Sequence, residues 1–523
     1  MRKLSDLEYL KLSKFQQSWY NFLMFLCAIP RFFLNIFKGI GKFFVNIFVK
    51  IKDGISDIGY TFAKGNWAVK LSFLIFGAGN LFYGQVLRGL LFLLFEAVFF
   101  VYMFLPCGGI YWLQKGQWFK VGATVGTQQG HMELVEAIPG FGGVETWIPG
   151  DDSVKVMLYG LLTIIFVIAF LWTWRLQVKQ CRINMDIYAS GRKIKKAKDD
   201  LRSLVDDQFH KTLLALPVVG ILFFTVLPII YMVLIAFTNY DFSNDGYANL
   251  FSWVGLENFN QLADFGEGGM GLTFGEILGW TLIWAFFATF TNYFLGMFVA
   301  LMINKKGIKL KKLWRTVLVM TIAIPQFVSL LYVSHLFDSS GIIGKVLYDL
   351  HLLPQAMLDA SQYSLWQNPT AARILVIVIN IWIGIPHIML MATGILMNIP
   401  QDLYESSKID GATGVQQFTK ITLPYMLFVT GPYLLTSFVG NLNNFNVIYL
   451  LSGGGPSKGL AGGATVGYTD LLITWLYKMT VDTAEQKYYL GSIIGIMVFL
   501  VVAILSLIVY NVIPSTKSEE DFQ

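Results

Sequence analysis

The sequence predicts an all-α membrane protein that crosses the bilayer about eight times. Hydrophobic residues make up 55% of the 523 residues and charged residues only 14%, a composition that excludes an ordinary water-soluble fold. Apolar runs of membrane-spanning length recur along the chain. The basic residues gather beside these runs, as the positive-inside bias of membrane proteins predicts. The net charge of +6 is therefore not interpreted as a sign of nucleic-acid binding.

The first 66 residues are predicted to form a basic cytoplasmic region on the membrane surface. Residues 31–52 place apolar side chains on one helical face and basic or amide side chains on the opposite face. Such a helix lies on a bilayer with its basic side toward anionic headgroups, so membrane lipids are expected partners. Packing against another domain is the alternative. The apolar face would consist of Phe33, Phe37, Ile40, Phe44, Ile47 and Ile51.

The apolar runs predict the membrane helices. A short first run from Trp67 to Tyr83 is interrupted by two glycines and an asparagine, so it is interpreted as a re-entrant or interfacial hairpin arm that forms one region, 67–105, with the first span. Eight longer runs have the length of a membrane helix. They lie near residues 87–105, 154–174, 212–237, 277–303, 314–337, 371–397, 425–451 and 488–513.

Charge sets the predicted orientation. Residues 176–198 and 305–315 are rich in Lys and Arg, whereas residues 238–275 contain five acidic residues and neither Lys nor Arg. The two basic segments are therefore expected in the cytoplasm and the acidic one outside. With eight crossings of the plasma membrane, the N-terminus and the tail at 516–523 also lie in the cytoplasm.

The segments between the spans differ in size. Residues 106–153 contain paired glycines and several acids, and are predicted to be an extracellular loop or small cap. Residues 154–210 are predicted to hold the second span and a basic cytoplasmic loop. Residues 338–370 and 452–486 are shorter outer segments, which either receive a binding protein or only connect helices.

The most informative stretch is a water-facing segment at residues 398–424, between two long apolar runs. Asn398 and Pro400 suit the start of a helix, and Gly411 suits its end. The residues after Gly411 have room for a second short helix, and Pro424 removes a backbone donor where the next span is expected to begin. The segment is therefore predicted to be a helix-turn-helix knob at the membrane surface.

This segment resembles the coupling loop of ABC importer permeases. From Glu405 to Pro424 it has a Glu, two small residues, Asp-Gly-Ala, an aromatic residue and Ile-x-Leu-Pro. The resemblance implies a type I (MetI/MalF-like) permease core over residues 211–515, whose coupling loop docks on a cytoplasmic ATPase. The family usually has alanines where this chain has two serines. The expected coupling residues are Tyr404, Glu405, Ser406, Ser407, Asp410, Gly411 and Ala412.

Polar residues inside two predicted spans mark a candidate substrate path. Ser437, Asn441 and Asn444 recur at i, i+4 and i+7, which predicts one stripe on one helix face. In the preceding span, Asn380 lies about one turn before Gly384, and the following proline is expected to open the backbone. Amide groups donate and accept hydrogen bonds, which suits sugar hydroxyls. Hydrogen bonding between membrane helices is the alternative reading of the same residues.

The same residues resemble the larger (MalF-type) membrane subunit of maltose and maltodextrin importers. The resemblance implies that Asn380, Gly384, Ser437, Asn441 and Asn444 line a sugar site. It also implies malto-oligosaccharides as substrate, or another oligosaccharide within the same class of importer. The partners it implies are a second homologous permease, two copies of a cytoplasmic ABC ATPase and an extracellular sugar-binding protein. Gly440 and His387 depart from the family pattern, which often has aromatic residues there.

Several features that would indicate another function are absent from the sequence. No G-x-x-x-x-G-K-[ST] phosphate loop occurs, so the chain is expected not to be an enzyme, and ATP and Mg are expected only on the partner ATPase. No metal-ligand spacing is found, and three well-separated cysteines imply no disulfide framework. The main alternative is an ion-coupled secondary transporter, for which Glu96 is the one acid well inside a span. A non-transporting membrane scaffold would need neither the polar stripe nor the knob.

Overall fold

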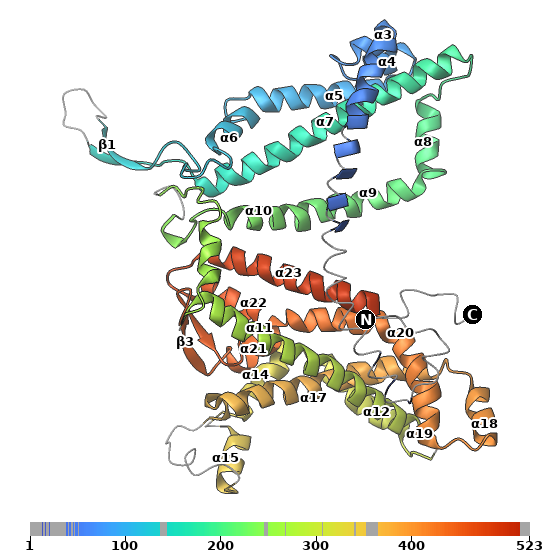
Figure 1. Ribbon diagram of the computed structural model, residues 1–523, viewed down its shortest axis with the longest axis vertical. Coiled ribbons are helices and arrows are strands. Elements are labelled where there is room, and N and C mark those ends of the chain that lie inside the picture. The colour runs from blue at the N-terminus through green and yellow to red at the C-terminus, as the bar shows by residue number, and fades with distance from the viewer. Residues whose placement is uncertain are drawn as a thin grey trace. The chain divides into compact units, whose positions relative to one another are not determined.

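The computed structural model describes residues 52–512, apart from 136–143, 245–248, 267, 306, 339–340 and 352–363, together with scattered positions between 13 and 50. The chain is mainly helical (Figure 1). It divides into two compact units, one of Met1–Tyr111 with Leu161–Val219 and one of Trp112–Gly160 with Gly220–Gln523. The apolar face predicted within residues 31–52 lies outside the described residues.

The helices confirm the predicted class, an all-α polytopic membrane protein. Within the described residues, seven helices are long and apolar enough to cross a membrane, and a bent helix pair brings the number to eight. The seven helices are Val86–Phe104, Ser153–Ala189, Phe209–Ile235, Met270–Asn304, Pro369–Leu396, Gly414–Leu442 and Tyr488–Leu507.

In the first unit, a helical stretch at residues 52–64 is followed by two short helices, which lie where the sequence predicts a hairpin arm. Neither five-residue helix is long enough to cross a bilayer. Gly77, between them, has a φ of 76°, and an added Cβ would lie 2.2 Å from the carbonyl oxygen of Gly89. Both the left-handed backbone and this close approach require glycine. The helices of this unit are α3 (Trp67–Leu71), α4 (Ala78–Phe82), α5 (Val86–Phe104), most of α7 (Ser153–Ala189), α8 (Ala197–Val205) and most of α9 (Phe209–Ile221).

Side chains from the neighbouring helices satisfy the irregular backbone between α3 and α4. The carboxylate of Glu96 on α5 accepts a hydrogen bond from the Phe76 N–H at 2.8 Å. The side-chain oxygen of Gln177 on α7 accepts one from the Gly77 N–H at 3.4 Å. An unpaired backbone group is costly inside a bilayer. Glu96 therefore has a structural partner that explains its position inside an apolar helix.

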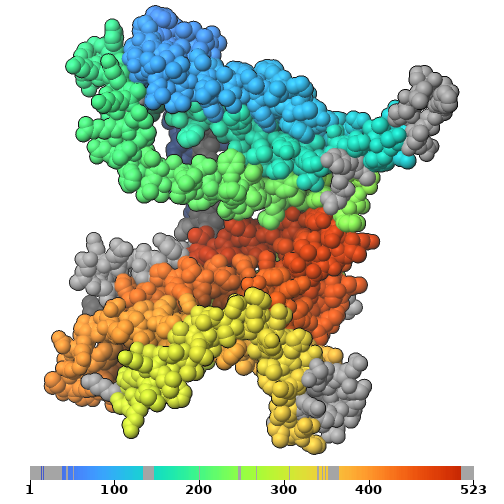
Figure 2. Space-filling model, turned by 180° about the vertical axis from the view of Figure 1, so that it is seen from behind, coloured from blue at the N-terminus to red at the C-terminus, as the bar shows by residue number. Residues whose placement is uncertain are grey.

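The second unit contains the helices that resemble the permease core. In Figure 1, α18 and α19 lie at one end of this unit and β3 at the other. Figure 2 shows one face of the unit, where the segments coloured yellow, orange and red lie against one another. Its helices are η1 (Leu222–Val226), α10 (Leu227–Ile235), α11 (Met270–Phe286), η4 (Phe287–Thr291), α12 (Asn292–Asn304), α13 (Lys311–Ala323), α14 (Gln326–Leu336), α15 (Ile342–Asp349), η5 (Leu365–Gln367), α17 (Pro369–Leu396), α18 (Gln401–Ile409), α19 (Gly414–Gln417), η6 (Phe418–Thr422), α20 (Leu423–Leu442), α21 (Phe445–Ser452), α22 (Leu472–Tyr477), η7 (Lys478–Asp482) and α23 (Tyr488–Val512).

Apolar packing holds these helices together. Trp284 of α11 is fully buried in a cluster that includes Val376 of α17 and Val447 of α21. A second cluster joins α12 to α17 and α20 through residues such as Met297 and Met426, which are both buried. Inside a bilayer, such packing stabilises the helix contacts through van der Waals attraction between closely fitting side chains. The helices that carry the candidate site are thus fixed against one another by close-packed side chains.

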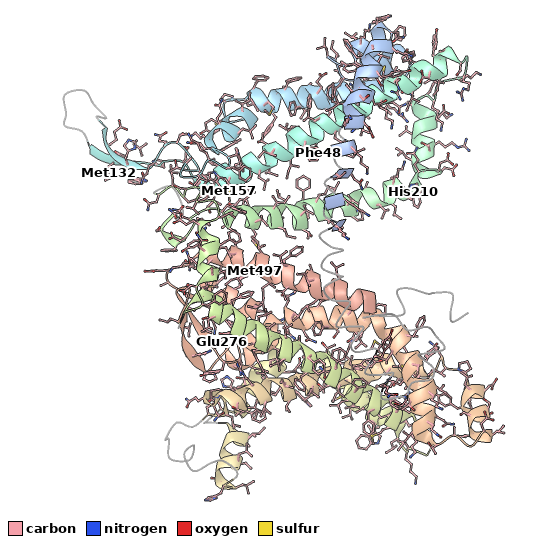
Figure 3. All side chains as sticks on the ribbon, in the orientation of Figure 1. Phe48, Met132, Met157, His210, Glu276 and Met497 are labelled. Atoms are coloured by element: carbon pink, nitrogen blue, oxygen red, sulfur yellow. The ribbon has the colours of Figure 1, made fainter. Side chains whose placement is uncertain are left out.

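Two small β-hairpins lie in the loops. β1 (His131–Val135) pairs antiparallel with β2 (Val144–Ile148), with Met132, labelled in Figure 3, opposite Trp147. β3 (Ser457–Ala461) pairs with β4 (Ala464–Gly467). Glu276, also labelled in Figure 3, lies on α11 and forms an ion pair with Lys458 of β3. Shorter helices in these loops are α6 (Gly109–Lys115), η2 (Phe242–Asn244) and η3 (Glu257–Ala263).

Two predicted spans differ from the structure. The run at 314–337 is not one straight helix, because α13 and α14 meet at an angle of 93°. The break falls at Pro325, which lacks an N–H donor, and the residue before it, Ile324, is extended as pre-proline residues prefer. The run at 425–451 is also interrupted, since α20 ends at Leu442 and α21 begins at Phe445.

The helix-turn-helix segment differs from the prediction in two details. Asn398 does not cap α18, whose N-cap residue is Pro400 without a side-chain hydrogen bond. The second helix is not a separate short helix, because one continuous helix runs from Gly414 to Leu442. Pro424 follows a π turn, η6, and sits in the first turn of α20 without breaking the helix. Gly411 ends α18 as predicted, with a φ of 79°.

Candidate functional site

The helix α17 supplies the first two predicted site residues. Asn380 is buried, with 7% of its surface exposed, and its side-chain amide makes no hydrogen bond to the described residues. Gly384 lies one turn further and faces Asn292 of α12, since an added Cβ would lie 2.4 Å from the Asn292 side-chain nitrogen. The glycine therefore allows α12 to approach α17 closely. The helix remains α-helical through Pro386, so the expected opening of the backbone does not occur.

The end of α20 and the junction that follows it supply two more predicted residues. Asn441 Nδ2 donates to Thr289 Oγ1 of η4 at 3.0 Å, and the Asn441 carbonyl accepts from Trp284 Nε1 at 3.1 Å. Asn444 Nδ2 donates to Asn441 Oδ1 at 3.2 Å. These two amides and one hydroxyl thus form a short chain of hydrogen bonds between η4 and the α20–α21 junction.

The predicted stripe along a single helix is wrong in one respect. Asn444 lies beyond the end of α20 and serves as the N-cap of α21, where its side-chain oxygen accepts from the Val447 N–H at 3.3 Å. A helix-capping side chain needs non-helical backbone, so the asparagine pair interrupts the helix instead of continuing it. Ser437 remains on α20, one turn before Asn441.

Sequence reasoning missed two residues of this site, Thr289 and Asn292. Both belong to the long helix Met270–Asn304, at the π turn η4 and directly after it, and both are at most 8% exposed. Thr289 contacts Asn441, and Asn292 contacts Asn380 and Gly384. The signal that points to them is the presence of polar side chains within an apolar run, which are costly unless they are paired or functional.

The predicted coupling residues fall into two groups on α18. Tyr404 and Ser407 face inward and are half-buried. The Tyr404 hydroxyl pairs with Thr422 Oγ1 at 2.8 Å, and Gln417 Nε2 donates to the Tyr404 carbonyl at 3.0 Å and to Ser407 Oγ at 2.7 Å. These bonds attach α18 to the helix that begins at Gly414.

The other coupling residues are available to a partner. Glu405, Ser406, Asp410 and Gly411 are exposed, and Ala412 is half-buried. Leu403 and Ile409, which the prediction did not include, expose 48% and 87% of their surfaces. Together with the exposed polar residues, these two side chains form the outer side of α18. One side of α18 is thus held to the permease, and the other is free to bind.

An apolar groove of about 600 Å³ lies beside this segment. Phe294, Phe298 and Leu301 of α12 form one wall, and Val415 and Phe418 belong to the other. The lining is mostly carbon, so the groove suits an apolar partner surface or lipid rather than a polar ligand. Its position places the beginning of the helix Gly414–Leu442 directly over α12.

The described part of the chain contains no group of three or more His, Cys, Asp or Glu residues that could hold a metal ion. Cys107 and Cys181 form no disulfide among the described residues. The candidate site itself is built from neutral amides, hydroxyls and a glycine. Its side chains can donate to and accept from a neutral polar ligand, but they offer neither a nucleophile with a base nor a metal site.

These features define a class of protein, a helical membrane transport subunit with a polar site among its helices and a helix-turn-helix segment at one end. Residues 292–518 match the family described as the binding-protein-dependent transport system inner membrane component. The chain belongs to this family, the permeases of ABC importers. As a member, it is a non-enzymatic subunit of a plasma-membrane transport system that depends on a binding protein.

Individual relatives are informative about the class of importer. The maltodextrin transport system permease protein MdxF of Bacillus subtilis is 34% identical over 377 residues, which are 71% of this chain and 85% of the relative. The maltodextrin permease MalC of Streptococcus pneumoniae is 32% identical over 375 residues, covering 71% and 85%. The galactooligosaccharides transport system permease protein GanP of B. subtilis is 29% identical over 434 residues, covering 82% and 93%.

Proposed function

We propose that this chain is the larger permease subunit of an ATP-driven importer of malto-oligosaccharides. The observation that carries the proposal is the similarity to two maltodextrin permeases over 85% of their lengths. The chemistry of the site supports it, because Asn380, Asn441 and Asn444 offer neutral donors and acceptors. Ser437 and the backbone at Gly384 complete the sugar site. Galacto-oligosaccharides are the second candidate substrate, from the similarity to GanP.

The importer would assemble around this subunit. A second homologous permease completes the translocation pathway, two copies of an ABC ATPase dock on the cytoplasmic side, and an extracellular binding protein delivers the sugar. ATP and Mg bind on the ATPase and supply the free energy. The N-terminal region 1–66, the segment 398–424 and the tail 516–523 face the cytoplasm, whereas residues 106–153 lie outside. The basic segments beside the spans support this orientation.

The contacts of α18 suggest how the ATPase moves the sugar site. Glu405, Ser406 and Asp410 meet the ATPase, while Tyr404 and Ser407 hold α18 to the helix Gly414–Leu442. That helix carries Ser437 and Asn441, and it is unbroken from the knob to the site. A displacement of α18 is therefore transmitted through one continuous helix. ATP drives the exchange between inward and outward states only through its differential affinity for them.

The proposal is tested on the complex reconstituted in lipid vesicles. ATP hydrolysis and sugar uptake are measured with and without the binding protein, over a panel of malto- and galacto-oligosaccharides. We expect malto-oligosaccharides with binding protein to stimulate hydrolysis. Gly411→Asp should abolish this stimulation by distorting the end of α18, and Asn441→Ala should reduce uptake. Uptake that follows an ion gradient, ignores ATP and tolerates Gly411→Asp would refute the importer function for this chain.

A further inference from the structure

The inference concerns Asn292, the first residue of α12, which is 8% exposed. Its Nδ2 atom donates to the carbonyl oxygen of Ala288 at 2.8 Å and to that of Asn380 at 3.4 Å. No donor among the described residues reaches its Oδ1 atom, which is buried. Buried polar atoms nearly always have a partner. An acceptor without one, next to a predicted site residue, indicates a place where a ligand donor belongs.

Gly384 gives this amide its position. A Cβ added at Gly384 would lie 2.4 Å from Asn292 Nδ2 and 2.6 Å from Asn292 Oδ1. The amide of Asn292 therefore occupies the space that a side chain on α17 would otherwise fill. Beside it, the side-chain amide of Asn380 makes no hydrogen bond to the described residues. Two neighbouring amides with unused capacity form a compact polar site that can accept from and donate to a pair of hydroxyls.

The backbone on both sides of this contact is irregular. Asn292 directly follows the π turn η4, a kind of insertion that is frequent at functional sites. Opposite it, Pro386 lies two residues beyond Gly384 and leaves the Trp382 carbonyl without its helical donor. Both helices are thus weakened where they meet at Asn292.

We propose that Asn292 is a sugar-recognition residue whose Oδ1 atom accepts a hydrogen bond from a substrate hydroxyl beside Gly384 and Asn380. The proposal rests on the importer function proposed above. It assigns Asn292 the role of selecting neutral polyhydroxylated ligands. A ligand without a hydroxyl at this position leaves the buried acceptor unpaired and is rejected, which is how hydrogen-bonding sites achieve strong discrimination.

Asn304 provides a matched control within the same helix. Its Nδ2 atom also donates one turn back, to the Ala300 carbonyl at 2.7 Å, and across to α17, to Thr393 Oγ1 at 3.2 Å. Unlike Asn292, it has donors at its side-chain oxygen, from Arg315. Asn304→Ala therefore removes the same kind of helix-to-helix link without touching the proposed site.

The experiment measures equilibrium binding of labelled maltotriose to the purified full complex, without binding protein, together with basal ATP hydrolysis and thermal stability. We expect Asn292→Ala to weaken maltotriose binding about tenfold, as the loss of one buried hydrogen bond predicts. Asn304→Ala should leave maltotriose binding within about twofold of wild type. Gly384→Ala, which displaces the Asn292 amide without replacing it, should reproduce the weakened binding.

The outcomes separate this inference from the proposed function. If the wild-type complex binds maltotriose and Asn292→Ala binds it equally well, the role of Asn292 is refuted while the importer function stands. Equal weakening by Asn292→Ala and Asn304→Ala, with equal losses of thermal stability, also refutes it, since both residues would then act only on the α12–α17 contact. A wild-type complex that neither binds maltotriose nor responds to the loaded binding protein refutes the proposed function itself.

Discussion

Replacing Lys478 with alanine should destabilise the permease far more than the same change at Lys458. Lys478 Nζ lies 2.8 Å from a carboxylate oxygen of Asp470, and the two side chains are 12% and 0% exposed. Lys458 pairs with Glu276, and these side chains are 38% and 48% exposed. The two variants thus remove the same type of charge from a buried pair and from an exposed pair in the same unit.

The structure sets the expected magnitude. Removing one partner of a buried ion pair costs about 3–5 kcal/mol, because the other charge remains buried without a counter-ion. In Lys478→Ala the Asp470 carboxylate keeps two donors, the Gly467 N–H at 2.7 Å and the Thr474 hydroxyl at 2.9 Å. The loss should therefore fall at the low end, about 3 kcal/mol. The exposed pair should contribute only about 0–1 kcal/mol.

The loss should also depend on pH. Burial raises the pKa of the Asp470 carboxyl, and Lys478 opposes that rise. Without Lys478 the pKa rises further. A carboxyl whose pKa is raised by folding favours the folded state when it is protonated, and that contribution is lost as the pH rises through the folded pKa. The destabilisation of Lys478→Ala should therefore be largest at neutral pH and should shrink in acid.

Thermal denaturation of the complex in detergent, followed at neutral and acidic pH, measures these effects. The double variant Asp470→Asn with Lys478→Met removes both charges and should recover most of the lost stability, because no charge is left buried alone. Equal losses for Lys478→Ala and Lys458→Ala, or no recovery in the double variant, would refute the reasoning from burial.

Three further predictions concern other parts of the chain. Glu96→Ala should cost about 1–3 kcal/mol in thermal denaturation of the complex, because the buried Phe76 N–H loses its acceptor. Glu96→Gln should retain most of the stability, and equal losses in the two variants would contradict the role of this hydrogen bond. Gly411→Ala should cost about 1–2 kcal/mol, since Gly411 has a φ of 79° and a left-handed residue with a Cβ is strained. Hydrogen exchange in the coupling segment measures this loss. In the same measurement, Gly414→Ala should be neutral or stabilising, because this position is helical and an added Cβ meets nothing within 4 Å. Burial opposes ionisation of Asp151, but hydrogen bonds from a lysine and two backbone N–H groups hold its pKa below the ordinary value. The stabilising effect of the Asp151 carboxylate is therefore complete above the ordinary pKa and is lost as the pH falls through the lowered pKa of the folded protein. Protease cleavage of the segment 112–160 should increase below about pH 4. Asp151→Asn should remove that pH dependence.

The sequence predicted most of the helices because membrane insertion depends on a local property, the apolarity of some twenty residues. The end of α18 at Gly411 was also predictable, because a left-handed helix terminus favours glycine at one position. The positions at which the helices break were not predictable from the sequence. Pro325 permits a sharp bend, yet Pro386 and Pro424 lie in unbroken helices. Whether a proline breaks a membrane helix depends on its tertiary surroundings, which a linear pattern does not contain.

The candidate site was predictable in part. Polar residues in apolar runs identified Asn380 and Asn441, and the structure brings both into contact with the segment 287–292. The expectation for Asn444 failed because it assumed a continuous helix, whereas the side chain caps the next one. Thr289 and Asn292 were overlooked because their spacing does not repeat along one helix face, and their importance comes from neighbours more than eighty residues away in the chain.

The π turn between α11 and α12 has a consequence for how sugar preference changes during evolution. A π turn accommodates one residue more than the α-helix it interrupts, and each residue of an α-helix advances the side-chain direction by about 100°. Deletion of a single residue within Phe287–Thr291 would restore a regular helix and swing every side chain on one side of it around the axis. Relatives could therefore exchange the entire wall of the pathway by a single-codon deletion, leaving the composition and hydropathy of the span almost unchanged.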